Sequence, residues 1–100
     1  MFRGTTPTHT FEVDIDTDLI KTIKITYYQD DEEILVKRTE DCTIKDGIIQ
    51  TKLSQEDTFL FIGNVPVMIY IRVLTTNDDA IITEPIVIAV RQCLDDEVLK

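Results

Sequence analysis

Two stretches of alternating apolar and polar residues constrain the fold more than any other feature of this chain. They are IKTIKITYYQ (residues 20–29) and VPVMIYIRVL (residues 65–74). Side chains on an extended strand point to opposite faces in turn, so this pattern predicts two half-buried β-strands. Their apolar faces comprise Ile23, Ile25, Tyr27, Val67, Ile69, Ile71 and Val73.

Shorter apolar stretches between turn signals extend the same pattern over the whole chain. QDDEE (29–33), the Asp-Gly pair (46–47) and TNDD (76–79) are typical of tight turns. The pattern predicts an all-β fold, an immunoglobulin-like β-sandwich of seven to nine short antiparallel strands, with a small closed barrel as the alternative. The expected strands are 8–15, 20–29, 34–39, 42–45, 48–53, 65–74, 80–83 and 86–91.

One short stretch, SQEDT (54–58), has a helical signature instead. Ser54 is followed three residues later by Asp57, the spacing at which each side chain bonds the other residue's backbone N–H. We expect one helical turn near residues 54–58, where the chain crosses from one sheet to the other.

The size and charge of the chain fit one soluble acidic domain. Its 100 residues suffice for a single β-sandwich domain, expected over residues 1–94, followed by an acidic C-terminal tail over residues 95–100. Nineteen acidic and ten basic residues give a net charge of -9, which argues against direct nucleic-acid binding. No apolar stretch approaches the roughly 20 residues of a membrane span, so we expect no membrane association and no signal peptide.

The segment DIDTD (14–18) resembles the start of a calcium loop but fails its other requirements. An EF-hand loop that began at Asp14 would need Gly at its sixth position and Glu at its twelfth, where this chain has Leu19 and Ile25. The alternation instead predicts a strand end, with Asp14 and Asp16 on the solvent face and Asp18 in the following turn.

No residue pattern indicates an enzyme. His9, the one histidine, lies on the apolar side of the first strand, and Ser54, the one serine, is explained as a helix cap. We therefore expect no catalytic residues, no cofactor and no metal site. Cys42 and Cys93 are expected to be small buried apolar residues rather than a disulfide.

The acidic residues gather in turns, and two interpretations stay open. Charged turns keep a β-protein soluble and discourage edge-to-edge pairing. Alternatively, several clusters converge on one face and imitate a phosphate backbone. The clusters are 30–33, 40–41, 56–57, 78–79 and 95–97. The residues expected to bind a partner are Tyr28, Asp30, Asp31, Glu32, Glu33, Met68, Tyr70, Asp78 and Asp79.

Nearly the whole chain resembles a group of small, mostly uncharacterised proteins encoded among the structural genes of phages and prophages of gut Gram-positive bacteria. The likeness rests on RGTTPTHTF (3–11), EDCTIKDGIIQTKLSQEDTFLF (40–61) and IRVLTTNDDAIITEPIVIAVRQCLDDEVL (71–99). The TKLSQEDTF corner also resembles the strand-crossing turn in the N-terminal β-sandwich of phage upper-baseplate proteins. The resemblance implies a virion-associated or assembly protein and supplies no catalytic residue.

These observations lead to one expected function and two alternatives. We expect a phage virion structural or accessory protein, in capsid decoration, neck, tail or baseplate, that acts through protein–protein contacts. Its partners would be other phage structural proteins or copies of itself, in the virion and, before assembly, in the host cytoplasm. The first alternative is an acidic phage-encoded inhibitor that blocks a host defence nucleoprotein by nucleic-acid mimicry. The second is a carbohydrate-binding adhesion module, which the absence of Trp disfavours.

Overall fold

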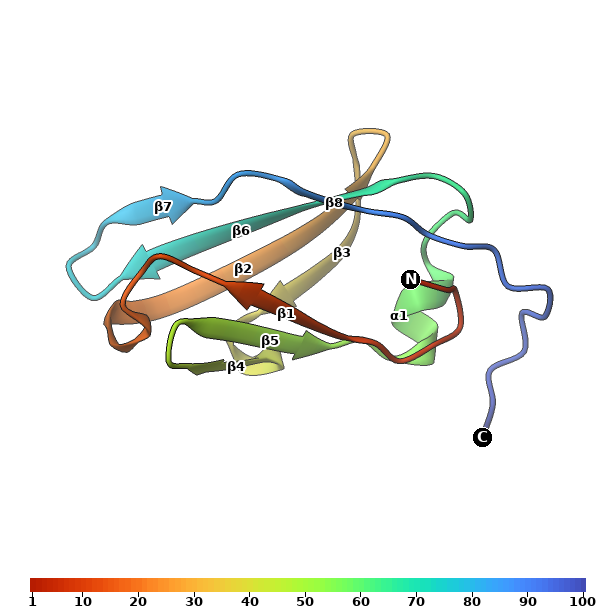
Figure 1. Cartoon of the computed structure of the whole chain (residues 1–100), viewed down its shortest axis with the longest axis horizontal. Coiled ribbons are helices and arrows are strands. Elements are labelled where there is room, and N and C mark those ends of the chain that lie inside the picture. The colour runs from red at the N-terminus through yellow and green to blue at the C-terminus, as the bar shows by residue number, and fades with distance from the viewer.

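The structure, a computed structural model that describes all of residues 1–100, is a sandwich of two antiparallel β-sheets (Figure 1). Its extents are 46 × 29 × 17 Å. The helical elements are η1 (Thr17–Leu19) and η2 (Thr39–Asp41), both 3-10 helices, and α1 (Gln55–Phe59). The strands are β1 (Thr8–Glu12), β2 (Ile20–Gln29), β3 (Glu32–Arg38), β4 (Cys42–Lys45), β5 (Ile48–Lys52), β6 (Val67–Thr75), β7 (Ala80–Ile82) and β8 (Ile86–Ile88).

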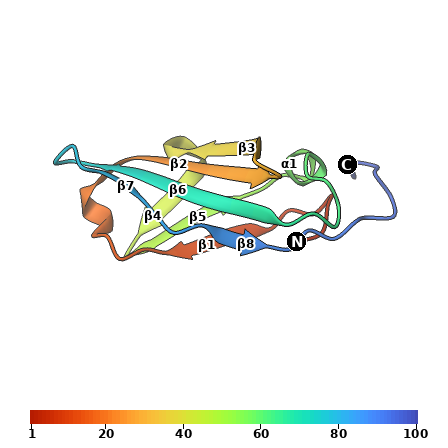
Figure 2. The same ribbon diagram turned by 90° about the horizontal axis from the view of Figure 1, so that it is seen from above.

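The strand order confirms the predicted sandwich, and the eight strands fall within the predicted seven to nine. The small sheet has the order β1-β5-β4, and the large sheet has the order β3-β2-β6, with β7 and β8 both paired to the far side of β6. These orders correspond to strands B-E-D and C′-C-F-G of an immunoglobulin-like domain. Figure 2 looks onto the large sheet, where β3, β2 and β6 lie side by side.

The apolar faces of β2 and β6 form the centre of the core, as their alternation predicts. Tyr27 lies opposite Ile69 across the two strands, and both side chains are at most 1% exposed. Burying one such large side chain stabilises the fold by roughly 1.5–3 kcal/mol. The complete core consists of Phe11, Ile23, Ile25, Tyr27, Ile49, Leu53, Phe61, Val67, Ile69, Ile71, Val73 and Val90.

The predicted helical turn is α1, and it crosses from β5 in the small sheet to β6 in the large sheet. Ser54 Oγ accepts a hydrogen bond from the Asp57 N–H at 3.0 Å, and the Asp57 carboxylate accepts one from the Ser54 N–H at 2.9 Å. Lys37 Nζ lies 2.8 Å from the same carboxylate. Burial by itself would raise the pKa of Asp57, but these hydrogen bonds and the charge of Lys37 lower it.

The first strand is shorter than its alternation predicts. β1 ends at Glu12 rather than Ile15, because Glu12 lies opposite Ile48, the first residue of its partner β5. The prediction that Asp14 and Asp16 occupy a strand face is therefore wrong. The segment DIDTD lies in a loop instead, where the Asp16 side chain accepts a hydrogen bond from the Asp18 N–H and caps η1.

The cysteines are less buried than predicted, and one side chain holds the C-terminal segment. Cys42 and Cys93 are free, as expected, but each is only partly buried. Residues 95–100 form no strand or helix. The Gln55 side chain nevertheless holds this segment through two hydrogen bonds, of 2.9 and 2.8 Å, to the backbone of Leu99.

A buried glutamine fixes the connection that leads into β6. Gln29 is 2% exposed, and its amide nitrogen donates to the carbonyl oxygens of Ile62 (2.9 Å) and Val65 (3.0 Å). Its Oε1 accepts from the Ile62 N–H at 2.8 Å. The side chain thus satisfies three backbone groups of a segment that has no sheet partner there, and fixes where β6 begins.

Replacing Gln29 by Leu is expected to destabilise the fold by about 1–3 kcal/mol, because it leaves buried backbone groups without a hydrogen-bond partner. The free energy of unfolding, measured by urea titration, tests this. The matched control is Gln50→Leu, which removes one exposed hydrogen bond to Thr10 and is expected to cost less than 0.5 kcal/mol, about what an ordinary surface change costs. Equal costs for the two variants would contradict the assigned role of Gln29.

Candidate protein-binding face

The outer face of the large sheet carries three of the residues predicted to bind a partner. Tyr28, Met68 and Tyr70 alternate with the buried residues of β2 and β6, so they point away from the small sheet, and each is partly exposed. The rings of Tyr28 and Tyr70 pack edge to face, with centroids 5.6 Å apart and an interplanar angle of 87°. Tyr28 lies opposite Met68 across the strands. The three side chains therefore form one amphipathic patch.

Two adjoining hollows extend along this face. One has a volume of about 460 Å³ and lies beside Thr22, Leu74 and Ala80. The other, of about 320 Å³, reaches Tyr28 and Tyr70. Both hollows are open to solvent rather than enclosed. The residues that line both hollows are Lys24, Arg72 and Ile82.

The first predicted acidic cluster borders the same face. Asp30 and Asp31 form the tight turn between β2 and β3, with φ of 50° and 63°. Two consecutive residues with positive φ are typical of the hairpin turns that match strand twist. Glu32 and Glu33 then begin β3, with Glu33 opposite Tyr28. Asp31 is the one carboxylate among the residues that line the two hollows.

The second predicted acidic cluster lies at the opposite end of the sheet. Asp78 and Asp79 belong to the turn after β6, next to the beginning of β2, since Ile20 lies opposite Thr75. The turn at Asp30 and Asp31 follows the other end of β2. With about 3.4 Å per residue over ten residues, the two clusters are about 30 Å apart. They do not form one acidic surface.

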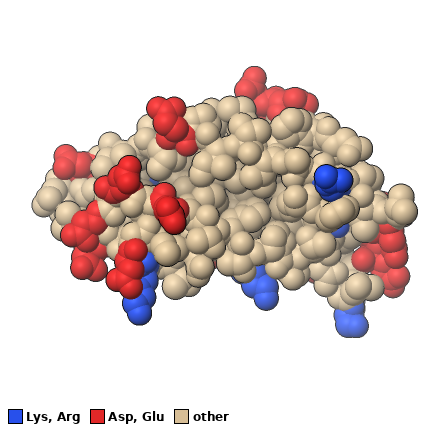
Figure 3. Space-filling model, in the orientation of Figure 1, with Lys and Arg blue, Asp and Glu red and all other residues tan.

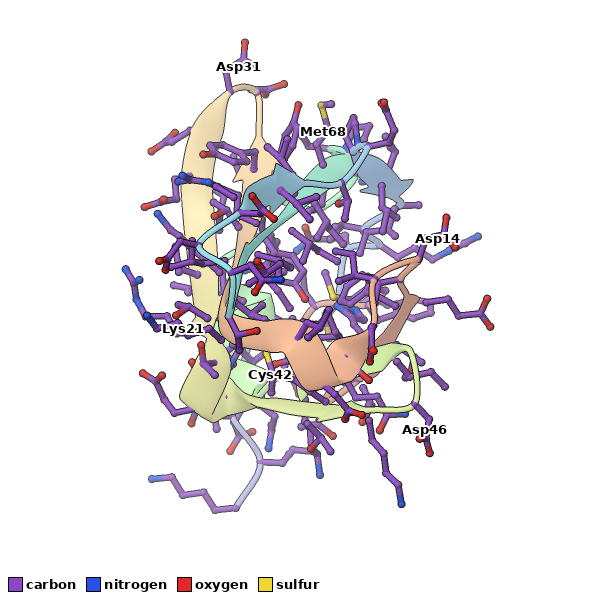
Figure 4. All side chains as sticks on the ribbon, turned by 90° about the vertical axis from the view of Figure 1, so that its left-hand side faces the viewer. Asp14, Lys21, Asp31, Cys42, Asp46 and Met68 are labelled. Carbon is purple, nitrogen blue, oxygen red and sulfur yellow. The ribbon has the colours of Figure 1, made fainter.

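The fold brings together other carboxylates that the sequence pattern left apart. The Thr76 N–H donates to the Leu19 carbonyl oxygen at 2.7 Å, and the Gly47 N–H donates to Thr17 Oγ1 at 3.2 Å. Three loops therefore meet at η1, and acidic side chains gather at this end of the molecule (Figures 3 and 4). The carboxylates on these loops are Asp14, Asp16, Asp18, Asp46, Asp78 and Asp79.

The sequence pattern also did not predict a row of three cationic side chains on the large sheet. Lys24 on β2 lies directly opposite Arg38 on β3 and Arg72 on β6. The alternation already placed Lys24 and Arg72 on polar strand faces. Only the register between the strands shows that all three side chains share one row.

His9 and Ser54, considered as catalytic candidates, both have structural partners. His9 Nδ1 lies 2.8 Å from the hydroxyl of Tyr27, which is fully buried. Burial lowers the pKa of His9 and raises that of Tyr27, so both side chains are neutral near pH 7. Ser54 caps α1. Both residues therefore have a role in the fold.

No group of three or more His, Cys, Asp or Glu side chains is arranged to hold a metal ion. None of the helices has the length and apolar composition needed to cross a membrane. Comparison of the chain with protein-family models, curated proteins and solved structures gives no match.

Lowering the pH from 7.0 to 5.5 is expected to destabilise the fold through His9. Because the pKa of His9 is lowered in the folded state, the unfolded chain binds more protons below pH 6.5. The contribution of neutral His9 to the free energy of unfolding is therefore fully present above pH 6.5. It decreases as the pH falls from 6.5 toward the lower pKa that His9 has in the folded state. Urea titrations at both pH values measure this, and His9→Gln should remove the decrease. The same pH dependence in His9→Gln, or a wild type that gains stability at pH 5.5, would contradict it.

Proposed function

We propose that this chain is a phage virion structural or accessory protein that docks on other virion proteins through the outer face of its large sheet. The observation that supports docking through this face is the patch of Tyr28, Met68 and Tyr70 beside two hollows on the sheet. Aromatic side chains and Met are enriched where proteins bind one another, because they combine apolar area with a polar or adaptable end. The resemblance to proteins encoded among phage structural genes supports the virion setting.

The proposal covers several positions in a virion. An immunoglobulin-like sandwich presents one outer sheet face while its core supplies stability, which suits capsid decoration, neck, tail or baseplate positions alike. The patch and hollows require a partner surface of complementary shape. Contacts between copies on a lattice remain part of the same proposal.

The geometry supports the alternative, nucleic-acid mimicry, less well. That function needs several acidic clusters on one surface, and two of the five predicted clusters, 30–33 and 78–79, are about 30 Å apart. Asp78 and Asp79 belong to the acidic end around η1, which lies at the far end of the sheet from Asp30 and Asp31. The outer sheet face also presents cations, which a phosphate mimic does not use.

Particles of the phage that encodes this chain provide the direct test. Mass spectrometry of purified virions should detect the chain at a constant copy number per particle. Its absence from purified virions would reject the proposed function.

The docking face is tested in the same particles by substitution. Replacing Tyr28 and Tyr70 together by Ser should lower the copy number about tenfold. Tyr is enriched among the residues that dominate binding energy, and a combined loss of about 1.4 kcal/mol lowers an affinity tenfold. The purified variant should still unfold cooperatively. Gln50→Ala, on the outer face of the small sheet, is the matched control and should leave the copy number unchanged. Equal incorporation of both variants would reject this face as the docking site.

A further inference from the structure

Three cationic side chains stand in one row across the outer face of the large sheet. Lys24 is the central residue, with Arg38 opposite it on one neighbouring strand and Arg72 opposite it on the other. The three ion pairs of the chain use other cations, so no carboxylate lies within ion-pair distance of the row. Like charges directly opposite one another on neighbouring strands destabilise a sheet.

The position of the row makes this arrangement unusual for an acidic chain. Nineteen carboxylates against ten cations give ample opportunity to place an acidic residue on β3 or β6 beside Lys24. Three of the ten cations instead line the hollows, with Lys24 and Arg72 in both and Arg38 in the larger one, and none of them makes an ion pair. A locally unfavourable arrangement of this kind is expected at sites kept for function rather than for stability.

The walls of the hollows add an apolar component. Ile82 on β7 lies directly opposite Arg72 and is 59% exposed, so it continues the row as an apolar side chain. Leu74 and Ala80 form the next opposed pair on the same face of these two strands, two residues away from Arg72 and Ile82. A ligand over Lys24 and Arg72 therefore meets cations in the centre and apolar side chains at the β7 edge.

We propose that these hollows receive an acidic segment of a partner protein, with carboxylates over the row and apolar side chains against Ile82. This inference rests on the proposed function, since it takes the outer face as the docking surface, and it adds the chemistry of the partner. Carboxylates pair well with guanidinium groups, which offer several N–H donors in one plane.

Charge complementarity favours this occupant over two others. Packing the same face of two copies together about a twofold axis would bring two unpaired cation rows against each other, which is repulsive. Binding of nucleic acid needs an extended cationic surface, and this chain offers three cations on a body of net charge -9. A short acidic segment needs only the row and its apolar border.

The test is a nuclear magnetic resonance titration of the isotope-labelled full chain. The probe is a capped heptapeptide in which Glu alternates with Val and Thr, and the comparison peptide has Lys in place of each Glu. The acidic peptide should shift the backbone amide signals of Lys24, Arg38 and Arg72, and the shifts should weaken as salt is added. The basic peptide should leave these signals unchanged.

One substitution separates loss of binding from loss of folding. Lys24→Glu should weaken binding of the acidic peptide at least tenfold. It should also raise the melting temperature, because the new carboxylate lies between Arg38 and Arg72. Lys52→Glu changes the net charge equally but lies on β5 of the small sheet, and it should leave the peptide affinity unchanged.

Three results would overturn the proposal. The first is a set of acidic-peptide shifts that lie outside β2, β3, β6 and β7. The second is equal weakening by Lys24→Glu and Lys52→Glu. The third is an oligonucleotide of single-stranded DNA that shifts the same amides as strongly. If the acidic peptide does not bind as predicted but the chain is present in virions, only the acidic partner is rejected. Absence from virions with the predicted peptide binding would reject the virion role alone.

Discussion

The antiparallel pairing of β2 with β6 is the constraint on which the rest of this molecule depends. The two strands are in one register from Thr22 opposite Leu74 to Tyr28 opposite Met68, so over this stretch each contributes two continuous rows of side chains. One row of each strand forms the core against the small sheet. The other row forms the outer face, with its aromatic pair and its cations. A shift of one residue in this register would exchange the two faces, so the strong apolar alternation fixes both at once.

The same alternation explains how much of the fold the sequence predicts. Period-two patterns in β2 and β6 indicate which residues are buried, and the spacing of Ser54 and Asp57 indicates the helical crossing, since both signals are local. The end of β1 is not local, because it depends on where β5 begins and the two strands are far apart in the chain. That is why the segment DIDTD was expected on a strand and lies in a loop.

The candidate site shows the limit of local patterns more clearly. Tyr28, Met68 and Tyr70 are predictable as outward-facing residues once their strands are recognised. The cation row is not, because it depends on the register that β2 makes with two different strands. The acidic end around η1 likewise depends on loops that meet only through long-range hydrogen bonds, such as the one from Thr76 to Leu19. Charged residues that only the tertiary structure brings together cannot be recognised from their order in the sequence.

The proposed docking surface is the outer face of the large sheet, rather than the acidic end around η1 or the small sheet. A photo-crosslinking amino acid placed at position 70 in assembled phage particles, with position 50 on the small sheet as the comparison, tests it most directly. Crosslinks are expected from position 70 to an acidic segment of another virion protein, and none are expected from position 50. Crosslinks from position 50 alone would contradict it.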